Sequence, residues 1–324
     1  MIIGKVKILP LADESLGVRS MCIFVETPDV KVIFDAGVSL APRRYGLPPH
    51  PLEFKAVREA RQRIIEYAEK ADVVTVSHYH FDHFTPSFKS WYEWIDESTY
   101  KLIYSDKVIL AKDIEDNINF NQRKRGIVFK SKIEELNSKL IYFDNSRMLF
   151  GSTLIEASPP LPHGAEGSKL GWVLAFTISY KNHKILYAPD VQGPISVKTL
   201  KYILAIKPDV LIIGGPPLYL AGKKVSGAEI DRGFENMSIL QDKIKYVLVS
   251  HHVLRDKEWR SKIRNNNFLL FSSLYGNKKS NKKSDFLEAY RDFLYKEYPP
   301  SQNFLEWINK YRRAKDINKK PPLD

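Results

Sequence analysis

Cysteine is almost absent from this chain, with Cys22 the single one among 324 residues. No intrachain disulfide can form, so stability must come from a buried core rather than from covalent links. The sequence can supply that core, because 44% of its residues are hydrophobic and it has 17 Tyr and 17 Phe. Scarce cysteine is typical of proteins from a reducing compartment, and we expect a cytoplasmic location.

Long hydrophobic runs are also missing. No apolar stretch approaches the ~18 residues that a membrane-spanning helix needs. Residues 1–6 lack the charged and apolar regions that begin a signal peptide. We therefore expect no role for a membrane in what this protein does.

The signatures of three common chemistries are missing as well. Neither G-x-S-x-G nor G-x-x-x-x-G-K occurs, which argues against a serine nucleophile elbow and a phosphate-binding loop. Cys22 lies in the apolar run 21–25, without an evident histidine or helix start that would activate its thiol. The sequence thus offers no nucleophilic side chain of these classes.

Acidic residues are fewer than basic ones, with 38 Asp and Glu against 50 Lys and Arg, so the chain has a net charge of +12 and a pI near 9.4. Residues 255–324 hold 17 Lys and Arg against 9 Asp and Glu, a net of +8, and residues 276–284 within them are typical of a polar, basic loop. This surplus fits an anionic partner, either a nucleic acid or a phosphorylated metabolite. A lysine-rich, solvated surface explains the same charge equally well.

Histidine is scarce too, with eight in the chain, yet three of them and one aspartate stand within six positions. His78, His80, Asp82 and His83 follow Val73–Val76, an apolar β-branched run that predicts a buried strand. His78 and His80 are two residues apart, so they point to the same side of an extended segment. A turn could direct Asp82 and His83 to a second point. Imidazole and carboxylate suit Zn²⁺, or else Mn²⁺ or Fe²⁺, so we predict two divalent metal ions.

The pattern H-x-H-x-D-H after an apolar strand resembles the signature of the metallo-β-lactamase superfamily. The resemblance implies an α/β fold, a four-layer αββα sandwich. It implies a single domain over residues 1–324, with a core of about 1–260 and a basic helical C-terminal extension of about 261–324 packed on it. The runs 14–20 and 41–48 are similar to those of an uncharacterised, mainly archaeal branch of predicted metal-dependent hydrolases.

In this superfamily the remaining ligands follow later strands. The matching positions are His163, in a Pro/Gly turn, and Asp190 and His251, each after an apolar run. The resemblance implies that the carboxylate of Asp190 bridges the two ions. The implied ligand sets are His78, His80 and His163 for the first ion and Asp82, His83, Asp190 and His251 for the second.

Two further residues belong to the candidate site. His252 is an alternative to His251 as the last ligand, or a hydrogen-bonding group behind it. Asp35 and Gly37 match the Asp-x-Gly that ends an early strand in the superfamily. By that comparison Asp35 would orient a ligating histidine through its second ring nitrogen. A turn-forming aspartate is the other interpretation.

Arg19 and the arginines of two later segments are candidate substrate-binding residues. The irregular loop 38–52 follows the strand that ends at Asp35, so we expect this loop, with His50, to lie over the site and bind an anionic group. Solvated loop arginines are the alternative. The variable segment 117–132 contributes a second group. The candidates are Arg19, Arg43, Arg44 and Arg123, with Asn121, Gln122 and Arg125 beside Arg123.

The resulting hypothesis is a metal-dependent hydrolase. A hydroxide bridged between two divalent ions would cleave an ester or phosphodiester of a small anionic substrate. Asp82 would ligate and orient the nucleophile, and Asp190 would fix the spacing of the ions. Two alternatives stay open: a nuclease acting on RNA or DNA, which the basic C-terminus favours, and a non-catalytic, metal-dependent binding or sensor protein.

Overall fold

Two β-sheets pack face to face in the computed structural model, which describes residues 1–263, 268–275, 286–314 and 318–323. The predicted basic loop 276–284 lies outside the described residues. The first sheet has seven strands in chain order. They are β1 (Ile2–Ile3), β2 (Val6–Asp13), β3 (Met21–Glu26), β4 (Lys31–Phe34), β5 (Val73–Val76), β6 (Val108–Ala111) and β7 (Lys139–Tyr142).

The second sheet has six strands in the order β15-β14-β13-β12-β9-β8, and β10 and β11 form a separate hairpin. The strands are β8 (Arg147–Phe150), β9 (Thr153–Ala157), β10 (Leu161–Pro162), β11 (Trp172–Val173), β12 (Phe176–Tyr180), β13 (His183–Ala188), β14 (Val210–Gly214) and β15 (Tyr246–Ser250).

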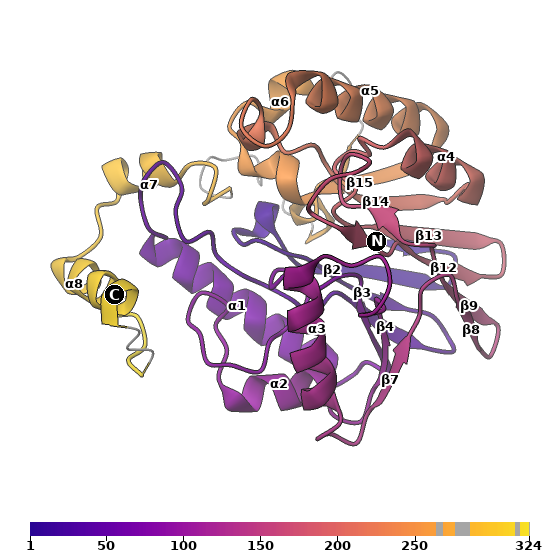
Figure 1. Ribbon diagram of the computed structural model, residues 1–324, viewed down its shortest axis with the longest axis horizontal. Coiled ribbons are helices and arrows are strands. Elements are labelled where there is room, and N and C mark those ends of the chain that lie inside the picture. The colour runs from indigo at the N-terminus through magenta and orange to yellow at the C-terminus, as the bar shows by residue number, and fades with distance from the viewer. Residues whose placement is uncertain (264–267, 276–285, 315–317, 324) are drawn as a thin grey trace.

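Side chains of alternating direction divide the interior into three layers of packing, as the two-residue period of a strand requires. In β14, Val210 and Ile212 enter the core between the two sheets. Leu211 and Ile213 point the other way, into a core shared with α4 and α5. A third core lies between the first sheet and α1 to α3. Figure 1 shows these helices on opposite sides of the paired sheets, so the predicted four-layer αββα sandwich is confirmed.

Helix α1 spans Pro51–Ala68 and illustrates why the chain begins a helix there. Proline at the first helical position has a suitable fixed φ, and Glu53 completes a capping box with His50. The His50 ring accepts a hydrogen bond from the Leu52 amide and contacts the Tyr298 carbonyl. The structure therefore gives His50 a capping position, away from the anion-binding position that the loop suggested.

The other helices are short or moderate in length. Their bounds are α2 (Glu97–Tyr104), α3 (Phe120–Ile133), α4 (Val197–Ile206), α5 (Gly227–Lys243), α6 (Trp259–Lys262), α7 (Arg291–Glu297) and α8 (Gln302–Ala314), with 3₁₀ turns η1 (Glu14–Leu16), η2 (Leu218–Leu220), η3 (His251–Arg255) and η4 (Ser272–Tyr275). Among the described residues, no helix is both long and apolar enough to cross a membrane.

Parallel strands bring four candidate residues to one edge of the sandwich. β4 pairs in parallel with β5, and β13, β14 and β15 are parallel to one another. Carboxyl ends of parallel strands meet at the same edge of a sheet, where ligands commonly bind. Asp35 follows β4, His78 follows β5, Asp190 follows β13 and His251 follows β15. The topology thus explains how positions far apart in the sequence can share one site.

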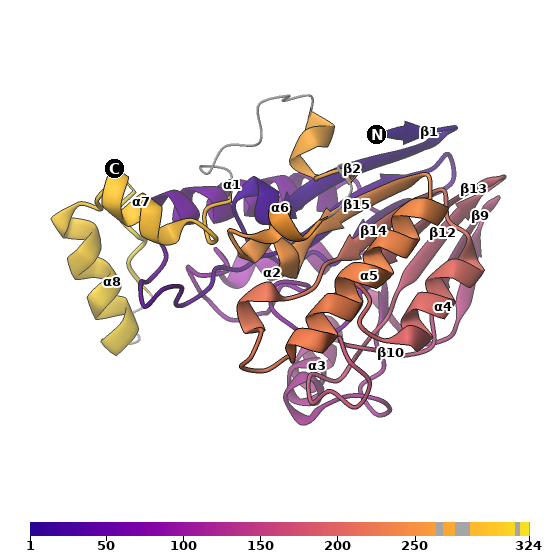
Figure 2. The same cartoon turned by 90° about the horizontal axis from the view of Figure 1, so that it is seen from above.

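The C-terminal segment is held to the sandwich by two ion pairs and by aromatic packing. Glu288 accepts two hydrogen bonds from Arg19, at 2.5 and 2.6 Å. Arg291 donates two to the buried Glu53, at 2.7 and 2.8 Å. Phe304 of α8 lies in the core that contains α1. Both views show α7 and α8 beside α1 at one end of the molecule (Figures 1 and 2).

Substitution of Glu288 by glutamine should lower stability by roughly 3 kcal/mol near neutral pH. Burial alone would raise the pKa of Glu288, but Arg19 and two further arginines lower it from 4.5 to about 2. Because the folded-state pKa is depressed, this stability is present above about 4.5 and is lost as the pH falls towards about 2. Urea unfolding at several pH values should therefore show the two proteins converging in acid.

The exposed pair in the same segment provides a control. Lys257 and Asp292 lie 2.6 Å apart with side chains 32% and 43% exposed, so Asp292→Asn should cost less than about 1 kcal/mol. Equal losses from Glu288→Gln and Asp292→Asn would contradict the assignment.

Candidate metal centre

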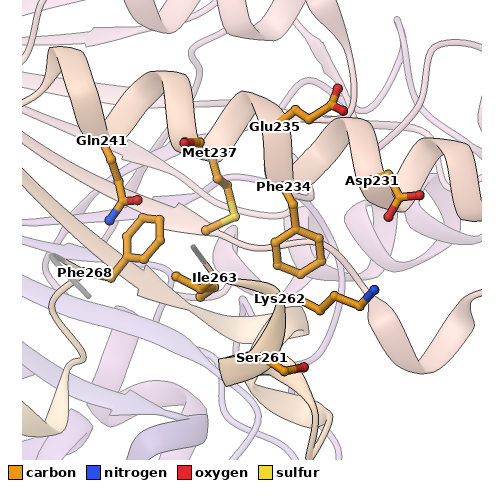
Figure 3. A pocket seen from close by; sticks show the side chains of 10 residues that line it. Asp231, Phe234, Glu235, Met237, Gln241, Ser261, Lys262, Ile263 and Phe268 are labelled. Atoms are coloured by element: carbon orange, nitrogen blue, oxygen red, sulfur yellow. The ribbon is translucent and has the colours of Figure 1, made fainter. Parts of the chain in front are cut away.

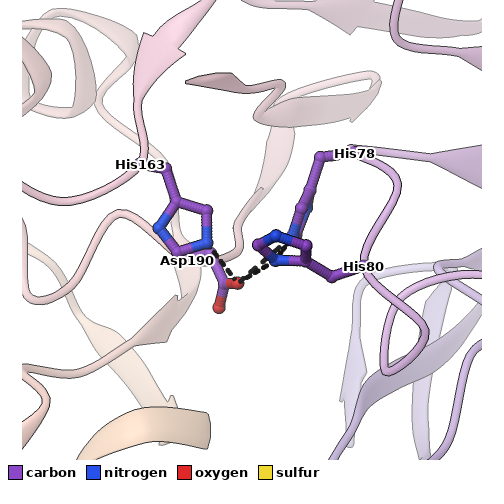
Figure 4. Close-up of side chains that lie close together, drawn as sticks. All are labelled: His78, His80, His163 and Asp190. Atoms are coloured by element: carbon purple, nitrogen blue, oxygen red, sulfur yellow. Dashed lines mark hydrogen bonds and ion pairs between the residues drawn. The ribbon is translucent and has the colours of Figure 1, made fainter. Parts of the chain in front are cut away.

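Three imidazoles and one carboxylate converge on a single point (Figure 4). Nε2 of His78 lies 2.9 Å from Nδ1 of His80 and 3.2 Å from Oδ2 of Asp190. Nε2 of His163 lies 2.8 Å from the same oxygen. All four donor atoms fall within 4.8 Å of one another. Ligand atoms around one tetrahedral zinc ion lie roughly 3.3 Å apart, so this first cluster has the dimensions of a metal site.

A second cluster adjoins the first and consists of Asp82, His83 and His251. The Nε2 atoms of His83 and His251 are 3.1 Å apart, and Asp82 Oδ2 lies 3.5 Å from His251 Nε2. Oδ1 of Asp190 is 2.9 Å from that same nitrogen. Oδ1 of Asp190 thus faces the second cluster, while Oδ2 faces the first and also lies 3.5 Å from His83 Nε2, so the carboxylate stands between the two clusters.

The charge states of Asp190 and His78 favour a cation. Burial alone would raise the pKa of Asp190, but His251, His83 and the other imidazoles around it hold the pKa well below its ordinary value. Burial, with His83 and His80 nearby, lowers the pKa of His78 well below its usual range. Asp190 is therefore ionised and His78 neutral, and these are the forms in which carboxylate and imidazole bind metals. At His83 and His251, burial would lower the pKa, but Asp190 and the carboxylate behind each ring raise it, so a cation at the second cluster has to displace protons.

Asp35 stands behind His83, as the resemblance implied. Its Oδ2 lies 2.8 Å from His83 Nδ1, and its carboxylate also accepts hydrogen bonds from the Tyr187 hydroxyl and from the amide and hydroxyl of Ser77. With Nδ1 donating to Asp35, the Nε2 lone pair of His83 faces the second cluster. This hydrogen bond fixes both the tautomer and the ring orientation of His83.

His251, rather than its neighbour, joins the second cluster. His252 reaches Asp190 Oδ1 at 3.3 Å through Nε2, while its Nδ1 lies 2.8 Å from the Tyr219 hydroxyl. It contacts neither Asp82 nor His83 at hydrogen-bonding distance among the described residues. His251 thus belongs to the second cluster, and His252 stays the alternative ligand, because the donor atoms of Asp190, His251 and His252 also lie within 4.8 Å of one another.

Two charged residues of this region were not predicted from the sequence, Glu14 and Arg255. Oε1 of Glu14 lies 3.1 Å from Nδ1 of His251 and accepts a 2.7 Å hydrogen bond from Arg255 Nε. Arg255 also donates to Asp82 Oδ2 at 3.1 Å. Burial would lower the pKa of Arg255, but Glu14 and other nearby anions raise it well above its usual value. A permanent cation therefore lies beside the second cluster.

The backbone is strained where the strands deliver these residues. Asp35, Asp190 and His251 have φ angles of 50°, 47° and 67°, in the left-handed region that side chains other than glycine seldom occupy. Gly37 allows a still closer approach, because a Cβ there would lie 2.4 Å from the backbone nitrogens of His83 and Phe84. Eight other non-glycine residues of the described chain also have positive φ, and aspartate and histidine adopt this region more readily than most residues, so these angles serve to turn the three side chains into the site.

Buried polar atoms without hydrogen-bond partners are a separate indication that the site fits divalent ions. Among the described residues, Nε2 of His163, Nε2 of His252 and Oδ1 of Asp190 are buried without a hydrogen-bond partner. Leaving such atoms unsatisfied costs roughly 1–3 kcal/mol each, and a cation at each cluster would satisfy those that face it. The nitrogen-rich donor set suits zinc and tolerates manganese or iron.

A cleft of about 670 Å³ opens over the two clusters. His80, Asp82, His163, Asp190 and His252 line its floor. The walls carry the aromatic rings and cations that would meet a substrate. They include Arg19, Phe81, Phe88, Tyr92, Arg125, Tyr219, Lys224 and Arg255.

The structure does not bring all the predicted arginines to this cleft. Arg123 points away and pairs with Glu115 on the exposed side of α3. Arg43 is exposed and outside the cleft lining. Arg44 donates to the Arg255 carbonyl and packs on the Tyr219 ring, so it supports the wall from behind.

Of the predicted anchors, Arg19 lines the cleft, but both of its bonds go to Glu288. Asn121 is exposed, and Gln122 is buried, with its side chain bonded to the Leu170 carbonyl. Arg125 is the member of this segment that lines the cleft.

Another hollow, of about 470 Å³, lies between α5 and α6, away from the histidines (Figure 3). Asp231 and Glu235 lie on its rim with Lys262, and Phe234 and Met237 line its interior. Within the described part of the chain, the groups able to hold a metal all belong to the histidine clusters. The chemistry of this molecule is therefore concentrated in the first cleft.

Zinc added to the metal-free protein should raise its melting temperature, since ligand at about 1,000 times its Kd contributes about 4 kcal/mol. Asp190→Asn should remove most of this increase, because the shared carboxylate becomes a neutral amide. His183→Ala is a matched control, as that histidine is 36% exposed and pairs with Asp209. A zinc-dependent increase that is the same in all three proteins would disprove the site.

Comparison with known proteins agrees with the fold. The family described as "Beta-lactamase superfamily domain" matches residues 18–228. A "UPF0282 protein" of Pyrobaculum arsenaticum is 43% identical over 303 residues, covering 90% of this chain and 95% of that protein. Another, of Methanopyrus kandleri, is 42% identical over 293 residues, covering 89% and 98%.

Among solved structures, the chain is similar to the metallo-β-lactamase fold protein YhfI from Bacillus subtilis. That likeness has a TM-score of 0.49 and 15% identity over 81% of this chain and 92% of that one. The family predicted from the histidine motif is confirmed by the sequence matches. The chain belongs to the metallo-β-lactamase superfamily of metal-dependent hydrolases and, within it, to the UPF0282 family.

Proposed function

We propose that this protein is a hydrolase that uses two divalent metal ions, zinc in the first place, to cleave an ester or phosphodiester of a small anionic substrate. The observation that carries the proposal is the pair of adjoining donor clusters, joined by Asp190, at the floor of an open cleft. Two bound ions would lower the pKa of a shared water and neutralise charge that develops on substrate oxygens.

The protein's own side chains prepare this site in three ways. His78, His80 and His163 would hold one ion, and His83, His251 and Asp82 the other. Asp190 would bridge them and fix their spacing. Asp82 is the ligand that lines the cleft while being held by Arg255 at 3.1 Å, so its carboxylate is positioned to orient an attacking water.

Arg125 and Lys224 replace the loop arginines as candidates for binding the substrate's negative charge. Both line the cleft. The Arg125 guanidinium lies 4.2 Å from the centre of the Phe81 ring and donates to the Tyr79 carbonyl, so it is held in place with donors to spare. A small anion bound in the cleft would therefore meet side chains of positive charge.

The nuclease alternative rests on the basic C-terminal segment, in which the structure pairs three cations with acidic partners. Arg255 bonds to Glu14, Lys257 to Asp292 and Arg291 to Glu53. These three are neutralised within the fold, and the other lysines and arginines of residues 255–324 keep nucleic-acid cleavage as the second candidate function.

Turnover should depend on the shared carboxylate. A screen of the zinc- or manganese-loaded protein on p-nitrophenyl phosphodiesters, esters and thioesters should find one hydrolysed class. Asp190→Ala should then reduce kcat/KM by about a thousandfold or more, because charge stabilisation at both clusters is lost. His183→Ala should retain full activity. Hydrolysis that persists in Asp190→Ala, or no hydrolysis of any class by the loaded wild type, would reject the proposal.

Arg125 should act in substrate binding. Arg125→Ala should raise KM about 10-fold or more with little change in kcat, since a charge-assisted hydrogen bond contributes ~1.5–3 kcal/mol. Arg123→Ala removes a like charge two residues away on the exposed side of α3, and steady-state kinetics should show no change. Equal effects of the two substitutions would indicate general electrostatics instead of a specific contact.

A further inference from the structure

The two metal clusters differ in what lies behind them. Behind the first, Nδ1 of His78 meets the Ser77 hydroxyl at 3.0 Å, and Nδ1 of His163 lies 3.5 Å from the Gln192 amide. These partners are neutral. Behind the second cluster stand two carboxylates and the buried guanidinium of Arg255, whose side chain is 2% exposed.

The guanidinium does not fill the metal position. Its Nη2 lies 3.0 Å from Nδ1 and 3.0 Å from Nε2 of His251. A nitrogen equally close to both ring nitrogens lies over the face of the imidazole and cannot point along either lone pair. The Nε2 lone pair therefore still faces His83 and Asp190, and Arg255 is stacked beside the site.

Glu14 and Arg255 act on His251 with opposite charges. Oε1 of Glu14 lies 3.1 Å from Nδ1 of His251 as an ion-pair partner, and Oδ2 of Asp35 lies 2.8 Å from Nδ1 of His83, so in both rings Nε2 is left to face the cluster. Arg255 neutralises Glu14 at 2.7 Å and contacts the ligand oxygen of Asp82 at 3.1 Å. Glu14, Asp35 and Asp82 attract a divalent ion to this cluster, and a fixed cation this close offsets part of that attraction, an effect that burial strengthens.

We propose that Arg255 makes the metal centre unequal: the ion at His78, His80 and His163 binds first and tightly, and the ion at Asp82, His83 and His251 binds more weakly. The second ion exchanges with the medium, and the guanidinium sets its affinity. Arg255 is thus a positioning residue that controls how many metals the centre holds at a given metal concentration. This inference rests on the two-metal part of the proposed function.

The test is a metal titration of the full-length protein without substrate, so that it is independent of any hydrolysis assay. Metal-free protein is titrated with Co²⁺ or Zn²⁺ against a chelator, and bound metal is counted by elemental analysis. The wild type should bind one ion per chain at least tenfold more tightly than the second. His163→Ala should remove the tight ion and His83→Ala the weak one.

Two substitutions then distinguish an electrostatic effect of Arg255 on metal affinity from structural damage to the site. Arg255→Met removes the positive charge at similar length and should tighten the second ion about tenfold or more, while Glu14→Gln should weaken it. Structural damage would weaken binding in both proteins. Arg255→Lys, which keeps the charge, should still bind the first ion more tightly than the second, as the wild type does. Circular dichroism checks that each protein is folded.

Two equal, tight sites in the wild type would overturn the proposal, and this outcome requires no variant. It is equally overturned if folded Arg255→Met holds the second ion no more tightly than the wild type does. If Arg255→Met fails to fold, the wild-type order and the Glu14→Gln result decide the matter.

Discussion

The carboxylate of Asp190 is the interaction on which the rest of the site depends. It is buried, ionised and within 3.3 Å of an imidazole nitrogen of His78, His163, His251 and His252. A charge in such a place is costly unless it is paired. The imidazoles are held so close only because strands from both sheets end around it. The fold therefore serves to gather nitrogens around one anion, and a cation completes the balance of charge.

The positions of these groups follow from ordinary rules of sheet construction. β4 and β5 run in parallel, so Asp35 can support His83 through Nδ1. β13, β14 and β15 are parallel as well, which places Asp190 and His251 at the same edge. The strained backbone at Asp35, Asp190 and His251 is compensated by packing on three sides, since each strand before them is buried.

The sequence predicted what depends on local pattern. The strand Val73–Val76, with the histidines after it, could be recognised because β-branched residues and metal ligands follow in order. His163, Asp190 and His251 could be placed only by resemblance, since a lone histidine after a strand carries little information by itself. The geometry brings all of these candidates together, and their role as ligands remains a prediction.

Contacts between distant segments could not be predicted in this way. Glu14 and Arg255 are 241 positions apart, and nothing in either local sequence indicates the pairing. Arg43 and Arg44 looked suitable because their loop follows Asp35, yet the loop turns its arginines outward or behind a wall.

The capping of α1 by His50 shows how the C-terminal segment takes part in the body of the fold. The same ring that starts α1 contacts the Tyr298 carbonyl, just past the end of α7. Glu53, one turn into that helix, is bonded to Arg291. The start of an early helix is thus completed by residues 238 and 248 positions later in the chain, so a nascent chain that has not yet reached them emerges with α1 only partly secured.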